Sequence, residues 1–161
     1  VVFDGEAQLG GIAMPHGRVH ESLLSSRTDP MNLQIALLLL GAENGSRTGG
    51  VNIKQGTVLN IDVQPEGGKR VPVEDWLINK KTSGKMERFG WVFVGSSFSH
   101  DMHNMAKEEG NIVNIWSFGN TVLDNPAPTG NEDDFIVVNP DTVAKYETHV
   151  TVYLSFKKQS E

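Results

Sequence analysis

The apolar run "MNLQIALLLL" (residues 31–40) constrains the fold of this chain more than any other segment, because only Asn32 and Gln34 in it are polar. Asp29 can accept a backbone N–H as a helix N-cap, and Pro30 suits the first helical position. Gly41 follows the run and suits the C′ position, the first residue after the end of a helix. A helix that is apolar nearly all round is expected to be buried. The run therefore predicts a central core helix with sheet on at least one side.

A β-hairpin and a helical turn are predicted after the helix. Apolar and polar residues alternate over 57–63, which indicates a half-buried strand. Pro65 to Gly68 is a turn sequence, and 69–73 returns as the second strand. The segment 73–80, "VEDWLINK", predicts a short helix that directs Trp76 and Leu77 inward.

Further short strands are predicted from apolar runs between Gly- and Pro-rich turns. A first edge strand is expected within 1–13, with a turn near Gly10-Gly11. The last strand, "THVTVYLSF", has the highest β-propensity in the chain. The remaining expected strands are 19–25, 91–94, 111–118 and 135–138.

These elements predict an α+β fold in which a mostly antiparallel or mixed β-sheet of short strands packs on one buried central helix, with one or two minor helices. The 161 residues show no internal repeat and no domain boundary, so residues 1–161 are expected to form a single domain. Neither a βαβ alternation nor a Gly-rich loop between strand and helix is present. The pattern therefore argues against a doubly wound nucleotide-binding fold.

The charge of the chain argues against nucleic acid and anionic membranes as partners. The formal net charge is −6, whereas duplex binding requires a basic surface. The basic residues Lys80, Lys81, Lys85 and Arg88 are dispersed and predict a solvated face. The longest strongly apolar segment is far shorter than the roughly 20 residues that a transmembrane helix needs. An unknown protein or a small-molecule ligand is thus the expected partner.

Cysteine is absent from the chain. Its absence excludes disulfides, thiolate nucleophiles, Cys-type zinc sites and iron–sulfur clusters. The chain begins at Val1 rather than Met. We therefore expect a processed product from which a targeting segment could have been removed.

Histidines in two segments are the candidate metal ligands. His100, Asp101 and His103 follow the strand at 91–94, and the two imidazoles would share a face of a helical turn. His16 and His20 lie four residues apart and could join them, with zinc as the ion that such a set would hold. The alternative interpretation is that these are polar residues of exposed loops.

Two hydrolase motifs are incomplete. The zincin pattern His-Glu-x-x-His fails because Ser22-Leu23-Leu24 follows His20-Glu21. The segment 95–99, "GSSFS", lacks the second glycine of the nucleophile elbow.

Several blocks of sequence, in a specific order, resemble the YdjY-like domain of bacterial proteins over about residues 4–157. They are "HESLL" at 20–24, "ALLLLGAENG" at 36–45, "VPVEDWLINKKTSGKM" at 71–86, "WVFVGSSF" at 91–98 and "GNIVNIWSFGNTVLDNP" at 110–126. The resemblance implies a fold without an assigned biochemical role, often in exported proteins. Some members carry an iron–sulfur label, which does not transfer because Met14-Pro15 stands where a family Cys-Pro is expected.

Two functions follow as hypotheses. The first is a non-enzymatic binding or interaction domain that is exported, periplasmic or otherwise associated with the envelope. The alternative is a metal-dependent, hydrolase-like enzyme that uses His100, Asp101 and His103. The first is favoured because every catalytic pattern lacks a required member.

Overall fold

The computed structural model describes residues 10–48, 53–116, 118–125 and 136–158. Its helices are α1 (Pro30–Leu39) and α2 (Met105–Glu109), with 3₁₀ turns η1 (Val19–Glu21) and η2 (Val73–Trp76). Its strands are β1 (Gly10–Ala13), β2 (Ser22–Ser25), β3 (Ser46–Thr48), β4 (Ile53–Gln55), β5 (Val58–Pro65), β6 (Val71–Pro72), β7 (Leu77–Asn79), β8 (Gly84–Lys85), β9 (Trp91–Phe93), β10 (Asn111–Asn114), β11 (Leu123–Asp124), β12 (Ile136–Val138) and β13 (Val150–Ser155).

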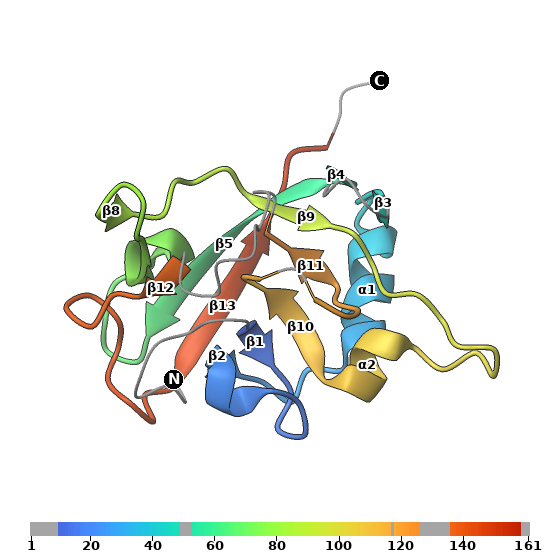
Figure 1. Ribbon diagram of the computed structural model, residues 1–161, viewed down its shortest axis with the longest axis horizontal. Helices are drawn as coiled ribbons and strands as arrows, with labels where there is room; N and C mark the ends of the chain where they lie inside the picture. Colours follow the sequence, from blue (N-terminus) through green and yellow to red (C-terminus); the bar gives the residue numbers. More distant parts are fainter. Residues whose placement is uncertain (1–9, 49–52, 117, 126–135, 159–161) are drawn as a thin grey trace.

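The main sheet is mixed and has the strand order β13-β5-β9-β11-β10-β1-β2, with β6 paired to β5. β1 pairs in parallel with β2 and β10 with β11, and the other pairs of this sheet are antiparallel. The sheet curls (Figure 1), so that its two end strands, β13 and β2, approach the same region of the molecule. Strands β12, β7 and β8 form a second sheet, and β3 and β4 a third. The predicted α+β class with a mixed sheet is confirmed.

The core lies inside the curled sheet rather than around a helix. Its largest fully buried side chains include Trp91 and Phe93 of β9, Leu59 and Ile61 of β5, and Leu123 of β11. Alternate residues of β5 contribute to it, since Leu59, Ile61 and Val63 are buried while their neighbours are not. Burying the apolar face of these strands removes apolar area from water, which stabilises the fold.

The prediction of a buried central helix was wrong. Only Pro30, Gln34 and Leu37 of α1 are buried, whereas Leu39 is 83% exposed and Ile35 43% exposed. The caps were predicted correctly, because Asp29 accepts a hydrogen bond from the Met31 N–H at 2.9 Å. An apolar helix sequence allows every face of the helix to be buried, but it does not show that another element packs against each face. Here the sheet curls around its own core, and only the side of α1 that carries Pro30, Gln34 and Leu37 is covered.

Other local predictions had mixed outcomes. The β5–β6 hairpin is confirmed. Of the helix expected over 73–80, only Val73–Trp76 is helical, as the 3₁₀ turn η2, whereas Leu77–Asn79 forms strand β7. The expected turn at Gly10-Gly11 was wrong, because both residues lie in β1, while the other part of that expected strand, residues 1–9, is outside the described residues. The strand expected over 111–118 ends at Asn114. Helix α2 was not predicted, although Asn104 caps its start and Gly110 ends it with φ +76°.

Candidate functional site

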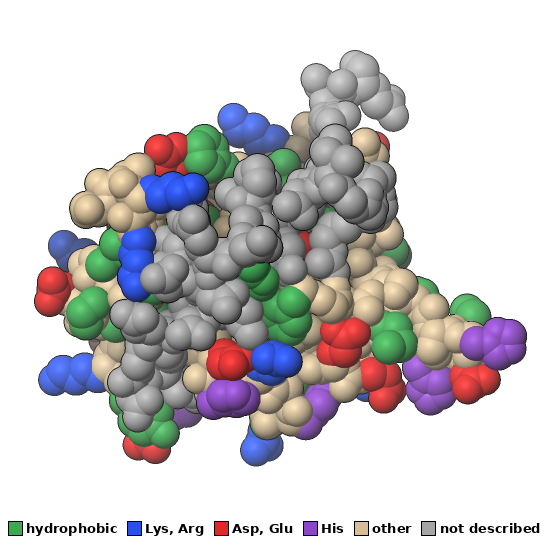
Figure 2. Space-filling model, in the orientation of Figure 1, with side chains coloured by type: hydrophobic (Ala, Val, Ile, Leu, Met, Phe, Trp, Pro, Cys, Tyr) green, Lys and Arg blue, Asp and Glu red, His purple; other side chains and the backbone are tan. Residues whose placement is uncertain are grey.

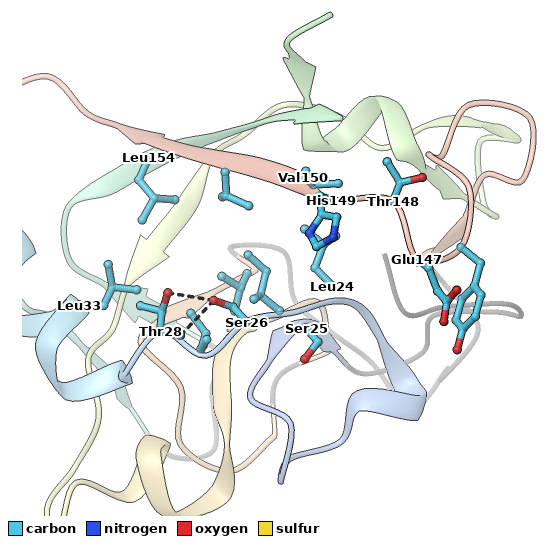
Figure 3. Close-up of a pocket in the computed structure, with 15 residues that line it drawn as sticks. Leu24, Ser25, Ser26, Thr28, Leu33, Glu147, Thr148, His149, Val150 and Leu154 are labelled. Atoms are coloured by element: carbon cyan, nitrogen blue, oxygen red, sulfur yellow. Dashed lines mark hydrogen bonds between the residues drawn. The ribbon is translucent and has the colours of Figure 1, made fainter. Parts of the chain in front are cut away.

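A groove of about 570 Å³ opens between the two end strands of the main sheet. In Figure 3, β13 crosses above it, and β2 and the start of α1 lie below. This volume falls within the range of about 300–1,000 Å³ that is typical of small-molecule sites. The lining residues are Ile12, Leu24, Ser25, Ser26, Thr28, Leu33, Ile112, Val113, Tyr146, Glu147, Thr148, His149, Val150, Val152 and Leu154.

The upper wall is the apolar face of β13. Side chains alternate between the two faces of a strand, so Val150, Val152 and Leu154 point the same way. All three line the groove and are only half-buried, although they pack against the core. Because these three alternate apolar residues are only half-buried, the described chain covers the inner face of β13 incompletely.

The opposite wall and the floor are also apolar. Leu24 of β2 and Leu33 of α1 point toward β13 in Figure 3. Ile112 and Val113 of β10, with Ile12 of β1, contribute the floor and belong to the buried core. The groove is therefore continuous with the hydrophobic interior.

Polar groups lie along the rim of the groove. The Ser26 hydroxyl donates to Thr28 Oγ1 at 2.9 Å and accepts from the Thr28 N–H at 3.1 Å. At the other end lie His149 and Glu147, both exposed, with Glu147 in the left-handed region at φ +64°. An apolar body with few polar groups at its edge is the usual composition of a ligand site.

The histidines predicted as metal ligands belong to two segments far apart in the sequence, and Figure 2 shows imidazoles (purple) at more than one place on the face in view. His16 Nε2 donates to the Lys107 carbonyl of α2 at 2.8 Å, and His20 lies 3.7 Å from Glu21 with its side chain 76% exposed. His103 Nδ1 lies 3.4 Å from Glu108 Oε1. His100 and Asp101 are exposed in the loop before α2.

Within the described chain, no group of three or more His, Asp or Glu side chains could hold a metal ion. Metal binding stays a prediction.

A polar network fixes the loop around Ser97. The Ser97 hydroxyl donates to Asn120 Oδ1 at 2.6 Å, and Glu109 Oε1 accepts from Asn120 Nδ2 at 2.8 Å. Ser96 donates its backbone N–H to Gln34 Oε1 at 3.0 Å. These contacts join α1, α2 and the loop after β9, so they account for the serines structurally.

A buried acid was missed by the sequence analysis. Glu74 is 1% exposed; its Oε1 accepts from Trp91 Nε1 at 3.0 Å and its Oε2 from Arg88 at 3.1 Å. Burial raises the pKa of the Glu74 carboxyl, although Arg88 and Trp91 oppose the change. Arg88 also contacts Asp62 at 2.6 Å. Arg88 is exposed, as the expectation of a solvated face requires, and its guanidinium also pairs with the carboxylates of Asp62 and Glu74.

Comparison with known proteins places the chain in a family. The model of the YdjY domain matches residues 6–155, nearly the whole chain. The chain belongs to the YdjY domain family. Searches of curated proteins and of solved structures found no match. The groove residues, from Ile12 to Leu154, all fall inside the YdjY match. No helix in the described part of this YdjY domain is long and apolar enough to cross a membrane.

Proposed function

We propose that this chain is a non-enzymatic binding domain that holds the apolar part of a ligand in the groove between β13 and β2. The observation that carries the proposal is the half-buried row Val150, Val152 and Leu154 facing a groove of about 570 Å³. Covering these side chains would remove further apolar surface from water, at roughly 25 cal/mol per Å². The hydroxyls of Ser26 and Thr28 at the rim would orient a polar end of the ligand.

The test uses the uncharged fluorescent probe N-phenyl-1-naphthylamine. Val152→Trp places an indole in the groove, whereas Thr151→Trp places the same indole on the exposed face of β13 and serves as the matched control. We expect saturable binding of one probe per chain, weakened at least tenfold by Val152→Trp and unchanged by Thr151→Trp. Equal binding by the wild type and Val152→Trp, with both folded by circular dichroism, would contradict the proposal.

We also propose that the domain works in the periplasm or is otherwise exported. The support is the frequent occurrence of related domains in exported proteins, which the family resemblance implies. Fractionation of cells that make the full-length protein tests this location. Recovery of the protein from the cytoplasm alone would contradict it.

A further inference from the structure

The outer edge of β13 carries backbone groups that no described strand pairs with, beside its groove-lining side chains. The Glu66 N–H donates to the His149 carbonyl at 2.9 Å, which makes this a hydrogen-bonded pair. Bonded and non-bonded pairs alternate along an antiparallel ladder. Val150, Val152 and Leu154, which face Pro65, Val63 and Ile61, are therefore in non-bonded positions. Their N–H and C=O groups point away from β5, and no backbone hydrogen bond within the described chain reaches them.

The second edge of the sheet lies across the groove. Among the described strands β2 pairs only with β1, and Leu24 and Ser25 of β2 line the same groove as β13. The pairings from β13 through β5, β9, β11, β10 and β1 give β13 and β2 the same sense along the ladder. One added strand can thus run antiparallel to both edges, the more stable of the two arrangements.

The charge at the groove sets a direction for such a strand. Glu147 is the only formally charged side chain among the described lining residues, and it lies at the end where β13 begins. A strand antiparallel to β13 brings its carboxyl-terminal end to this position. A lysine or arginine there would face Glu147 with opposite charge.

We propose that the ligand of the groove is an extended peptide segment that adds a strand to the edge of β13. Its apolar residues alternate, so that every second side chain enters the groove, and a basic residue near its carboxyl-terminal end lies beside Glu147. Backbone hydrogen bonds to Val150, Val152 and Leu154 supply affinity, and the apolar groove supplies selectivity. This inference rests on the proposed function, and it names the class of ligand.

The test uses the heptapeptide acetyl-Ser-Val-Thr-Val-Thr-Leu-Lys-amide and an analogue N-methylated at both valines. N-methylation removes two backbone donors and leaves the side chains in place. We expect the parent peptide to displace N-phenyl-1-naphthylamine and the methylated peptide to bind at least tenfold more weakly. Glu147→Lys should weaken the Lys-ended peptide and restore binding of a version that ends in Glu.

Each result has a separate meaning. Equal affinity of the two peptides would show side-chain contact without strand addition, and would overturn the inference. A probe that binds when neither peptide does would leave the proposed function standing and reject the peptide. Failure of the probe itself would reject the proposed function. A solution dimer that dissociates in Val152→Lys would assign the groove to a second copy of the chain, against the inference.

Discussion

The indole Nε1 of Trp91 donates a 3.0 Å hydrogen bond to the carboxylate of Glu74, and both side chains are buried. This bond joins strand β9 to the turn η2, two elements that are separated in the sequence. A buried polar group that loses its partner costs about 1–3 kcal/mol.

Trp91→Phe should therefore lower the free energy of unfolding by about 1–3 kcal/mol beyond the effect of lost volume. Phe93→Leu, a buried change on the same strand that removes no hydrogen bond, is the control. Urea denaturation at neutral pH measures both. A smaller loss in Trp91→Phe than in Phe93→Leu would show that the bond contributes little.

The raised pKa of Glu74 predicts a pH dependence of stability. The folded state holds this proton more tightly than the unfolded chain, where the ordinary value is 4.5. The stability linked to this group is therefore present below pH 4.5 and is lost as the pH rises through the raised pKa. We expect the wild type to gain stability relative to Glu74→Gln as the pH falls from about 7.5 to about 4.5. Urea denaturation at the two pH values is the measurement, and the opposite trend would contradict the assignment.

Asp29 links the two helices. Its carboxylate caps α1 through Met31 and accepts a 2.7 Å hydrogen bond from Lys107 of α2. The bond from Lys107 lowers the pKa of Asp29, so the stability it contributes is present above pH 3.8 and is lost as the pH falls through the lowered pKa.

Asp29→Ala should thus cost about 1 kcal/mol at neutral pH, the usual value of an N-cap. Lys107→Met retains the cap and removes only the surface ion pair, so its cost should be smaller. Thermal unfolding followed by circular dichroism compares the two variants. Equal losses would assign the effect to the ion pair.

The position of α1 predicts unequal effects of two leucines on one helix. Leu37 is 3% exposed and Leu39 is 83% exposed. Leu37→Ala should cost about 2–5 kcal/mol, as truncation of a buried leucine does. Leu39→Ala should change stability by no more than about 0.5 kcal/mol. A large loss in Leu39→Ala would show that the outer face of α1 is covered in solution.

Local sequence signals predicted which segments form helices and strands. They did not predict which faces of these elements are buried by other elements. Asp29 and Pro30 marked the start of α1 correctly, and the alternation around Leu59 and Ile61 marked β5. Exposure of Leu39 depends on how the sheet curls, which is set by pairings between strands far apart in the chain. A short sequence window carries no information on such pairings.

The candidate site was harder to predict for the same reason. The alternation of Val150, Val152 and Leu154 identified a strand with an apolar face, but not that the face borders a groove. The histidines were predicted as ligands by residue type alone, yet His16 bonds a helix carbonyl and His103 lies beside Glu108. The burial of Glu74 had no local signal, since two adjacent acids, Glu74 and Asp75, stand between Val73 and Trp76, and nothing in the sequence distinguishes the buried acid from the other.

Backbone chemical-shift mapping with N-phenyl-1-naphthylamine tests most directly whether the groove between β13 and β2 is a binding site. Amide resonances of uniformly ¹⁵N-labelled protein would be recorded during a titration with the probe. We predict saturable shifts concentrated on β13 at Val150, Val152 and Leu154 and on β2 at Leu24, with the loop around His100 unaffected. Shifts confined to the exposed face of α1, or none on β13, would contradict the account.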